Sequence, residues 1–112
     1  MTKTATQSEE PKSFSDVIGG GKFYPDLPRI DFQELLTRKI LVVDCKLIEN
    51  FTSQFGTYDC LLILVQMPED GEQYTTITSA VVIIKRIMKA KMEGLLPLYG
   101  TITKGETYYN IL

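Results

Sequence analysis

The stretch KILVVDCKLIENFTSQFGTYDCLLILVQ, residues 39–66, decides the fold of this 112-residue chain. It begins with a run rich in β-branched and aliphatic residues (39–51), in which Asp44 and Lys46 alternate with apolar side chains. A second run (58–67) is apolar at nearly every position, which is typical of a strand buried on most of both faces. The stretch therefore predicts two long strands joined by a turn.

Further along the chain the pattern changes from strand to helix and back. QYTTIT (73–78) follows the turn PEDG (68–71) and alternates well enough for a third strand. SAVVIIKRIMKAKMEG (79–94) has apolar residues at the i, i+3, i+4, i+7 spacing of a helix with one buried face. LYGTIT (98–103) and TYYNIL (107–112) predict two closing strands around a Lys-Gly turn.

The order of these elements, β-β-β-α-β-β, predicts the fold class. Three strands form a meander, a helix crosses and a hairpin closes, as in the OB-fold, a five-stranded and partly open Greek-key barrel. In that fold the second and third strands, with loops 1–2 and 4–5, bind oligonucleotides. We expect an all-β domain with one helix, built as a five-stranded OB-fold Greek-key barrel over residues 28–112.

Residues 1–27 differ from the rest in composition. They are rich in Thr, Ser, Glu, Gly and Pro, and the GGG at 19–21 is typical of a flexible joint. We expect a flexible N-terminal extension. Some of its side chains are more apolar than a solvated tail requires: Phe14, Val17, Ile18, Phe23 and Tyr24. Part of the extension is therefore expected to pack on the domain or on another chain.

Composition limits the classes of function. Histidine is absent, which removes the commonest acid–base group near neutral pH and the commonest metal ligand. The GGG at 19–21 lacks the following Lys-Ser/Thr and the preceding strand of a phosphate-binding loop. We expect no enzyme activity, no cofactor and no metal site. The net charge of −2 also provides no strong overall field that would attract nucleic acid.

The cysteines and the lengths of the apolar runs predict the cellular compartment. Cys45 and Cys60 lie inside apolar runs, and free buried thiols in a reduced cytosol are the expected state. The first residues contain no apolar core of a secretory signal, and no apolar stretch approaches the roughly 20 residues of a membrane span. We expect a cytoplasmic protein without membrane contact.

Residues 38–112 resemble the small OB-fold single-stranded-DNA-binding proteins of bacteriophages and mobile elements. The shared features are an FG step before an apolar strand in IENFTSQFGTYDCLLILVQ, a DG turn, a Ser-led helix in ITSAVVIIKRI, a Leu-Pro, a Lys-Gly turn and the aromatic strand TYYNIL. The resemblance implies sequence-tolerant binding of single-stranded DNA in replication or recombination, in a bacterial cell or a phage-infected host. The resemblance also suggests other partners: RNA, replication or recombination proteins, and further copies of the chain.

Aromatic rings in the predicted loop 1–2 are the first candidates for this binding. Stacking of a base on a ring stabilises a complex by about 1–3 kcal/mol and hardly distinguishes sequence. The segment NFTSQFGTY (50–58) carries Phe51, Phe55 and Tyr58, each of which is either a stacking platform or a lid folded onto the barrel end. The choice between these two roles stays open for each ring.

The third and fifth strands supply further candidates. Tyr74 and Thr76 share one face of the third strand, opposite Ile77, and we expect that face to be the outer, ligand-side surface. Tyr108 and Tyr109 point to opposite faces, so only one of them lines the groove. Tyr99 is interpreted as structural.

Lysines are the candidates for phosphate contacts. Lys46 is one, with pairing to Asp44 as its alternative, and Lys104 in loop 4–5 is another, with an ordinary hairpin turn as its alternative. The helix cations are interpreted as a solvated face: Lys85, Arg86 and Lys89. The predicted nucleic-acid-binding set is Lys46, Phe51, Phe55, Tyr58, Tyr74, Thr76, Lys104 and Tyr108.

A second class of function remains open at this point. The chain has 14 acidic and 12 basic residues, a balance that favours a protein partner over a polyanion. In this alternative the chain is an OB-type protein-interaction or oligomerisation subunit of a replication or other complex. The same aromatic surface and residues 14–24 would then dock a partner protein.

Overall fold

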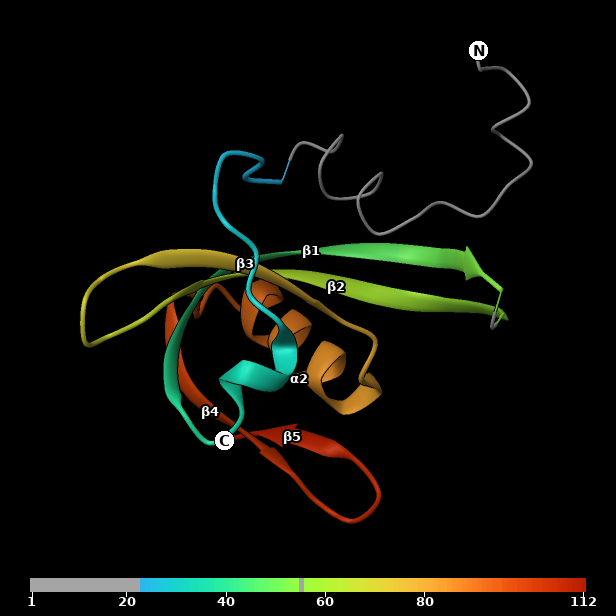
Figure 1. The fold of residues 1–112 in the computed structure, drawn as a ribbon. Coiled ribbons are helices and arrows are strands. Elements are labelled where there is room, and N and C mark those ends of the chain that lie inside the picture. The colour runs from blue at the N-terminus through green and yellow to red at the C-terminus, as the bar shows by residue number, and fades with distance from the viewer. Residues whose placement is uncertain (1–22, 55) are drawn as a thin grey trace.

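The structure, a computed structural model, describes residues 23–54 and 56–112. Figure 1 shows the arrangement of its elements: η2 (Phe32–Leu35), β1 (Lys39–Ser53), β2 (Gly56–Gln66), β3 (Gln73–Thr78), α2 (Val81–Met92), β4 (Leu98–Lys104) and β5 (Tyr109–Ile111). The predicted all-β class with one α-helix is confirmed for this part of the chain, and so is the β-β-β-α-β-β order. Asp31 caps the start of the 3₁₀ helix η2, because its carboxylate accepts a hydrogen bond from the Gln33 N–H over 3.0 Å.

The strands form one antiparallel sheet in the order β3-β2-β1-β4-β5. β1 pairs with β2 along most of its length, and the two strands extend as a hairpin beyond the body of the domain (Figure 1). β4 pairs with β1 only over residues 39–42. Register shifts interrupt the β1–β2 pairing twice, between Val42 and Asp44 and again between Ile48 and Phe51.

The sheet is not closed into a barrel, because β3 and β5 do not pair in the described part of the chain. β5 has only three residues, and the outward backbone groups of Ile111 are already bonded. Its N–H donates to Asn110 Oδ1 over 2.8 Å, and its carbonyl accepts from Arg86 Nε of α2 over 2.9 Å. The helix and a side chain of β5 itself therefore occupy the backbone groups of Ile111 that pairing with another strand would use.

Residues 28–37 cross the gap between β3 and the β4–β5 hairpin instead. On the β3 side the Thr75 N–H donates to the Pro28 carbonyl over 3.0 Å, and Thr75 in turn accepts from the Ile30 N–H over 2.9 Å. On the β4 side the Thr37 N–H donates to the Ile102 carbonyl over 2.8 Å. The segment that precedes β1 thus belongs to the fold.

Apolar side chains form a cluster on each face of the sheet. Alternation along β2 sends Leu61, Ile63 and Val65 toward α2, where they join the main core with Ile83 and Ile87. The other face holds a smaller cluster made of Phe23, Leu62 and Leu64, with Leu27, Val43, Ile48 and Ile77 packed against it. Burial on both faces explains why β2 is apolar at nearly every position.

The structure bears on the expectation that part of the extension packs on the domain. This expectation is confirmed for Phe23, which packs with Leu27 on the outer face of the sheet. Residues 1–22 of the extension lie outside the described part of the chain. Met92 continues the apolar spacing of the helical segment, but it is 80% exposed at the end of α2.

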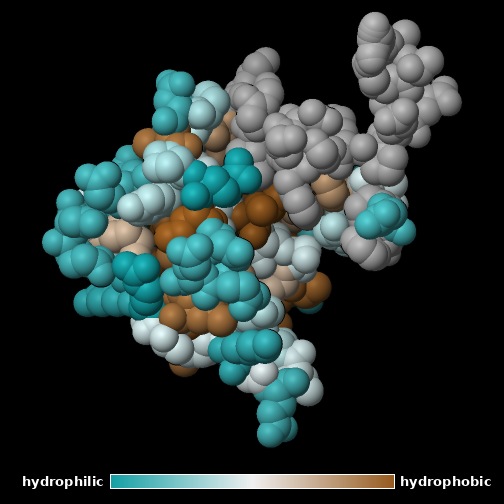
Figure 2. Space-filling view, viewed as in Figure 1, coloured by the Kyte–Doolittle hydropathy of each residue, from teal (hydrophilic) through white to brown (hydrophobic). Residues whose placement is uncertain are grey.

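Apolar surface also reaches the outside of the molecule. Figure 2 shows it among polar side chains in the middle of the face that Figure 1 presents. Large apolar side chains that are strongly exposed include Val81, Met92, Leu95, Leu98, Tyr99, Tyr108 and Leu112. In the described part of the chain no helix is long and apolar enough to cross a membrane.

Candidate nucleic-acid interface

The third strand turns its predicted binding residues inward. Tyr74 pairs with Val65 and Thr76 pairs with Ile63, so both share the face that looks toward α2. Thr76 is only 1% exposed, and Tyr74 is half-buried against the main core. The prediction that these two residues form the outer surface of the strand is wrong. Ile77, which was taken to mark the core face, belongs to the smaller cluster on the opposite face.

Of the two rings of the first loop region that the structure describes, one is partly accessible. Phe51 is 5% exposed, so it is not an open platform for a base. Its ring lies 5.8 Å from that of Tyr58, its partner across the hairpin, at an interplanar angle of 58°. Tyr58 is half-buried. Phe55 lies outside the described residues.

The two candidate lysines both reach solvent. Lys46 is exposed on β1, and the carboxylate of Asp44, its alternative partner, pairs with Lys91 of α2 at 3.2 Å instead. Lys104 is exposed at the end of β4, with its ammonium 5.8 Å from the centroid of the Tyr109 ring. Both ammonium groups are therefore accessible to a phosphate.

Two exposed aromatic rings, Tyr99 and Tyr108, lie on the outer face of the β4–β5 hairpin, one toward each end of β4. Ile102 and Ile111 point into the core, so alternation directs Tyr99 and Asn110 to the opposite side of the sheet. Tyr99 is 56% exposed, and Tyr108, which precedes β5, is 55% exposed. We call this surface the tyrosine face and define it as Lys39, Tyr99, Thr101, Thr103, Tyr108 and Asn110.

A lysine accompanies the first ring of the tyrosine face. Lys39 lies opposite Thr101 in the β1–β4 pair, and its ammonium is 4.6 Å from the centroid of the Tyr99 ring. This distance is within the range of a cation–π contact, which holds the ammonium beside an open aromatic surface. The face thus combines a stacking ring with a cation, the two groups that hold a single strand.

Sequence reasoning missed Tyr99, although a signal was present. In LYGTIT the polar or aromatic residues Tyr99, Thr101 and Thr103 alternate with Gly100 and Ile102, which is the period of a half-buried strand. Gly100 is on the inner face, where an added Cβ would lie 2.9 Å from the Ile111 side chain. The inner face is closely packed there, so the aromatic residue has to point outward.

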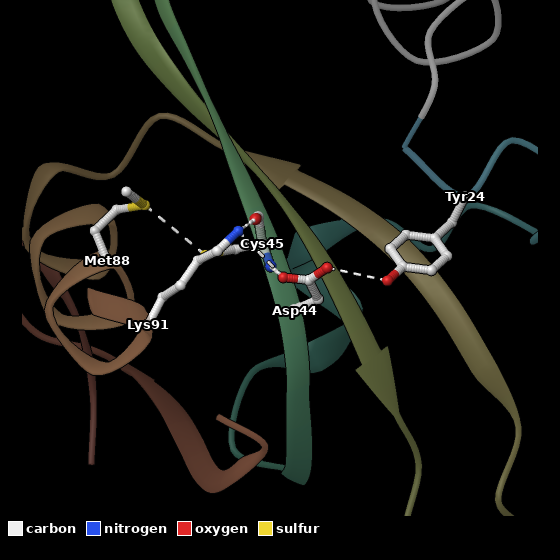
Figure 3. A network of polar contacts seen from close by, with 5 residues as sticks. All are labelled: Tyr24, Asp44, Cys45, Met88 and Lys91. Carbon is white, nitrogen blue, oxygen red and sulfur yellow. Dashed lines mark hydrogen bonds and ion pairs between the residues drawn. The ribbon is translucent and has the colours of Figure 1, made fainter. Parts of the chain in front are cut away.

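A polar network joins the N-terminal segment, β1 and α2 (Figure 3). One oxygen of Asp44 accepts from the Tyr24 hydroxyl over 3.0 Å, and the other accepts from the Cys45 N–H over 2.8 Å. The ammonium of Lys91 reaches Asp44 and the Cys45 carbonyl at the edge of β1 that β4 leaves unpaired. Cys45 itself is a free buried thiol with its sulfur 3.8 Å from that of Met88.

These contacts change the acidity of two groups. Burial tends to raise the pKa of Asp44, but hydrogen bonds from Cys45 and Tyr24, together with the Lys91 ammonium, hold it below its usual value. The hydrogen bond to the Asp44 carboxylate raises the pKa of the Tyr24 hydroxyl. The network therefore stabilises the ionised carboxylate of Asp44 and the neutral phenol of Tyr24. Its contacts hold the N-terminal segment, β1 and α2 together.

The described residues contain no group of three or more His, Cys, Asp or Glu side chains that could hold a metal ion. Comparison of the chain with protein-family models, with curated proteins and with solved structures gives no match.

Proposed function

We propose that this chain is a sequence-tolerant single-stranded-DNA-binding protein that acts in replication or recombination. One observation carries the proposal: the tyrosine face presents two rings that are more than half exposed, with the Lys39 ammonium 4.6 Å from one of them. Stacking on tyrosine rings accepts any base, and lysines neutralise the phosphates between stacked bases. This chemistry needs no cofactor and no metal.

The path of the strand follows β4 in this proposal. Tyr99 near the start of β4 stacks one base, and Lys39 beside it contacts a phosphate. Tyr108, which lies beyond the far end of β4, offers the next ring on the same face. Thr101 and Thr103 line the interval with hydroxyl groups. Lys46 and Tyr58 on the β1–β2 hairpin are candidate contacts for a longer oligonucleotide.

An OB-like architecture is part of the same proposal. The meander β1–β2–β3, a helix before β4 and a closing hairpin support it, and residues 28–37 span the place where β3 and β5 would pair in a closed barrel. In this arrangement the ligand surface moves from β2–β3 to β4–β5, because Phe23 and Leu27 cover the outer face of β2.

The test is binding of a fluorescein-labelled oligo-dT by anisotropy, at low and at high salt. We expect Tyr99→Ala and Tyr108→Ala together to weaken binding by at least tenfold, since each ring contributes about 1–3 kcal/mol. Both side chains are exposed, so the domain should stay folded by circular dichroism. Met92→Ala changes an exposed side chain outside the tyrosine face and is the control, and we expect it to leave binding unchanged. An unchanged dissociation constant in the double variant would refute the proposal.

A second candidate is the OB-type protein-interaction or oligomerisation subunit. The charge balance favours it, because a chain with 14 acidic and 12 basic residues suits a protein partner better than a polyanion. No gel shift of oligo-dT at low salt, together with a stable oligomer by size exclusion with light scattering, would favour this candidate.

A further inference from the structure

A hollow of about 330 Å³ opens where β4 begins, between the second half of α2 and residues 95–98. Its floor is made by side chains of the main core, among them Ile87 and Ile111. Its walls include Leu95, Leu98 and Leu112, each close to half exposed or more. We call this hollow the α2–β4 pocket. Scattered exposed leucines are ordinary, but several around one concave site are typical of a place that another molecule covers.

Cations of α2 stand on the rim of the pocket. Arg86 and Lys89 both line it, and the Arg86 Nε donates to the Ile111 carbonyl over 2.9 Å, which holds the guanidinium at the opening. The ion pairs of the described residues do not include Arg86. Lys89 lies 4.0 Å from Glu93, in an exposed i, i+4 pair that contributes little. Glu93 also lines the pocket, so Arg86, Lys89 and Glu93 together leave the rim with one positive charge, in a chain whose net charge is −2.

We propose that the α2–β4 pocket docks a short acidic peptide segment of a partner protein, anchored by a bulky apolar side chain. The apolar side chain fills the hollow over Ile87 and Ile111, and the flanking carboxylates pair with Arg86 and Lys89. The complementarity is twofold: an apolar anchor for the apolar hollow and negative charge for the positive rim. This gives the helix cations a binding role, whereas sequence reasoning treated them as a solvated face.

The pocket and the tyrosine face are separate surfaces that meet at Tyr99, which belongs to both. Leu98, the residue before Tyr99, points to the inner side of β4 and belongs to the pocket alone. Substitutions at Leu98 and Lys89 therefore test the pocket without removing a residue of the tyrosine face.

The experiment measures anisotropy of a fluorescein-labelled probe peptide in which Asp and Glu flank Phe and Leu. The matched control peptide has Lys in place of each acidic residue. We expect saturable binding of the acidic peptide that weakens with salt, and none of the basic one. Leu98→Asp and Lys89→Glu should each weaken binding about tenfold or more. Met92→Asp, an exposed apolar position of the same helix outside the pocket lining, should leave it unchanged.

Three results would overturn the proposal. One is the absence of saturable binding by the acidic peptide. Another is loss of oligo-dT binding in the Lys89→Glu variant together with complete displacement of the peptide by oligo-dT. These two observations would assign the rim cations to nucleic acid. The third is a dimer by analytical ultracentrifugation that Leu98→Asp dissociates, which would assign the pocket to a second copy of the chain. Thermal melting followed by circular dichroism checks that every variant is folded.

Discussion

The hydroxyl of Tyr24 donates to Oδ2 of Asp44 over 3.0 Å, across twenty positions of sequence. The other oxygen of the same carboxylate pairs with Lys91 at 3.2 Å. A single side chain at the first register shift of β1 therefore links the segment before η2 to the C-terminal half of α2 (Figure 3).

Removing the phenol tests the first half of this link. Tyr24→Phe deletes one hydrogen bond at an exposed site, and we expect the free energy of unfolding to fall by about 0.5–1.5 kcal/mol in urea denaturation. Tyr108→Phe removes a hydroxyl from another exposed ring and should change stability little. Equal losses in the two variants would show that the Tyr24–Asp44 contact is not responsible.

Acid should weaken the same network. The folded-state pKa of Asp44 lies below its unfolded value, so its contribution is fully present above an unfolded pKa of about 3.9 and is lost as pH falls through the folded pKa. We expect Asp44→Asn to lower stability at pH 7, and the deficit to shrink as pH falls below about 4. Urea denaturation of both proteins across this range measures the difference. A deficit independent of pH would contradict the assignment.

Thr76 offers a stabilising substitution. Its hydroxyl is buried and has no hydrogen-bond partner within the described structure, so the fold bears the cost of removing it from water. Thr76→Val keeps the shape and removes the polar atom, and we expect stability to rise by about 1 kcal/mol. Oligo-dT binding should not change, in contrast to what the sequence-based assignment of Thr76 to the binding surface would require.

Lys39 gives a test of the phosphate contact in the proposed function. Each phosphate neutralised on a single strand contributes about 0.7 to the slope of log affinity against log salt. We expect Lys39→Gln to weaken oligo-dT binding and to reduce that slope by about 0.7. Lys85→Gln, at an exposed position of α2 away from the tyrosine face, is the control. A slope that falls equally in both variants would indicate a diffuse charge effect and not a contact.

The closing hairpin depends on the small size of Gly100. A Cβ at this position would come within 2.9 Å of two Ile111 side-chain atoms, so Gly100→Ala pushes β5 away from β4 or forces Ile111 out of its rotamer. We expect a loss of about 1–3 kcal/mol in the free energy of unfolding. The double variant Gly100→Ala with Ile111→Val should recover part of the loss, and a larger loss in the double variant would contradict this explanation.

Periodicity was enough to locate the strands and the helix, because each has a regular spacing of apolar residues that local geometry dictates. It could not say which face of β3 meets the helix. Tyr74 and Ile77 are both apolar enough for a core, and the pairing of Tyr74 with Val65 decides the matter through β2. Alternation thus defines two faces, and long-range pairing assigns them.

The attachment of residues 28–30 to β3 was beyond sequence reasoning for a different reason. Pro28 and Ile30 are held by backbone hydrogen bonds to Thr75, more than forty residues away, and such bonds leave no pattern in side-chain type. Tyr99 is the opposite case, since its alternation with Gly100 and Ile102 was visible and was simply not weighed against a structural role.

Residues 28–37, which cross between β3 and β4, should protect the protein against aggregation. A chain shortened to start at Arg38 would retain all five strands and α2, but the outer backbone groups of Thr75 would face bulk solvent. A bare strand edge of this kind recruits strands from neighbouring molecules. We therefore expect the shortened protein to precipitate or to form polymers through edge-to-edge pairing of β3. In the unshortened chain, residues 28–37 prevent this by covering the edge of β3.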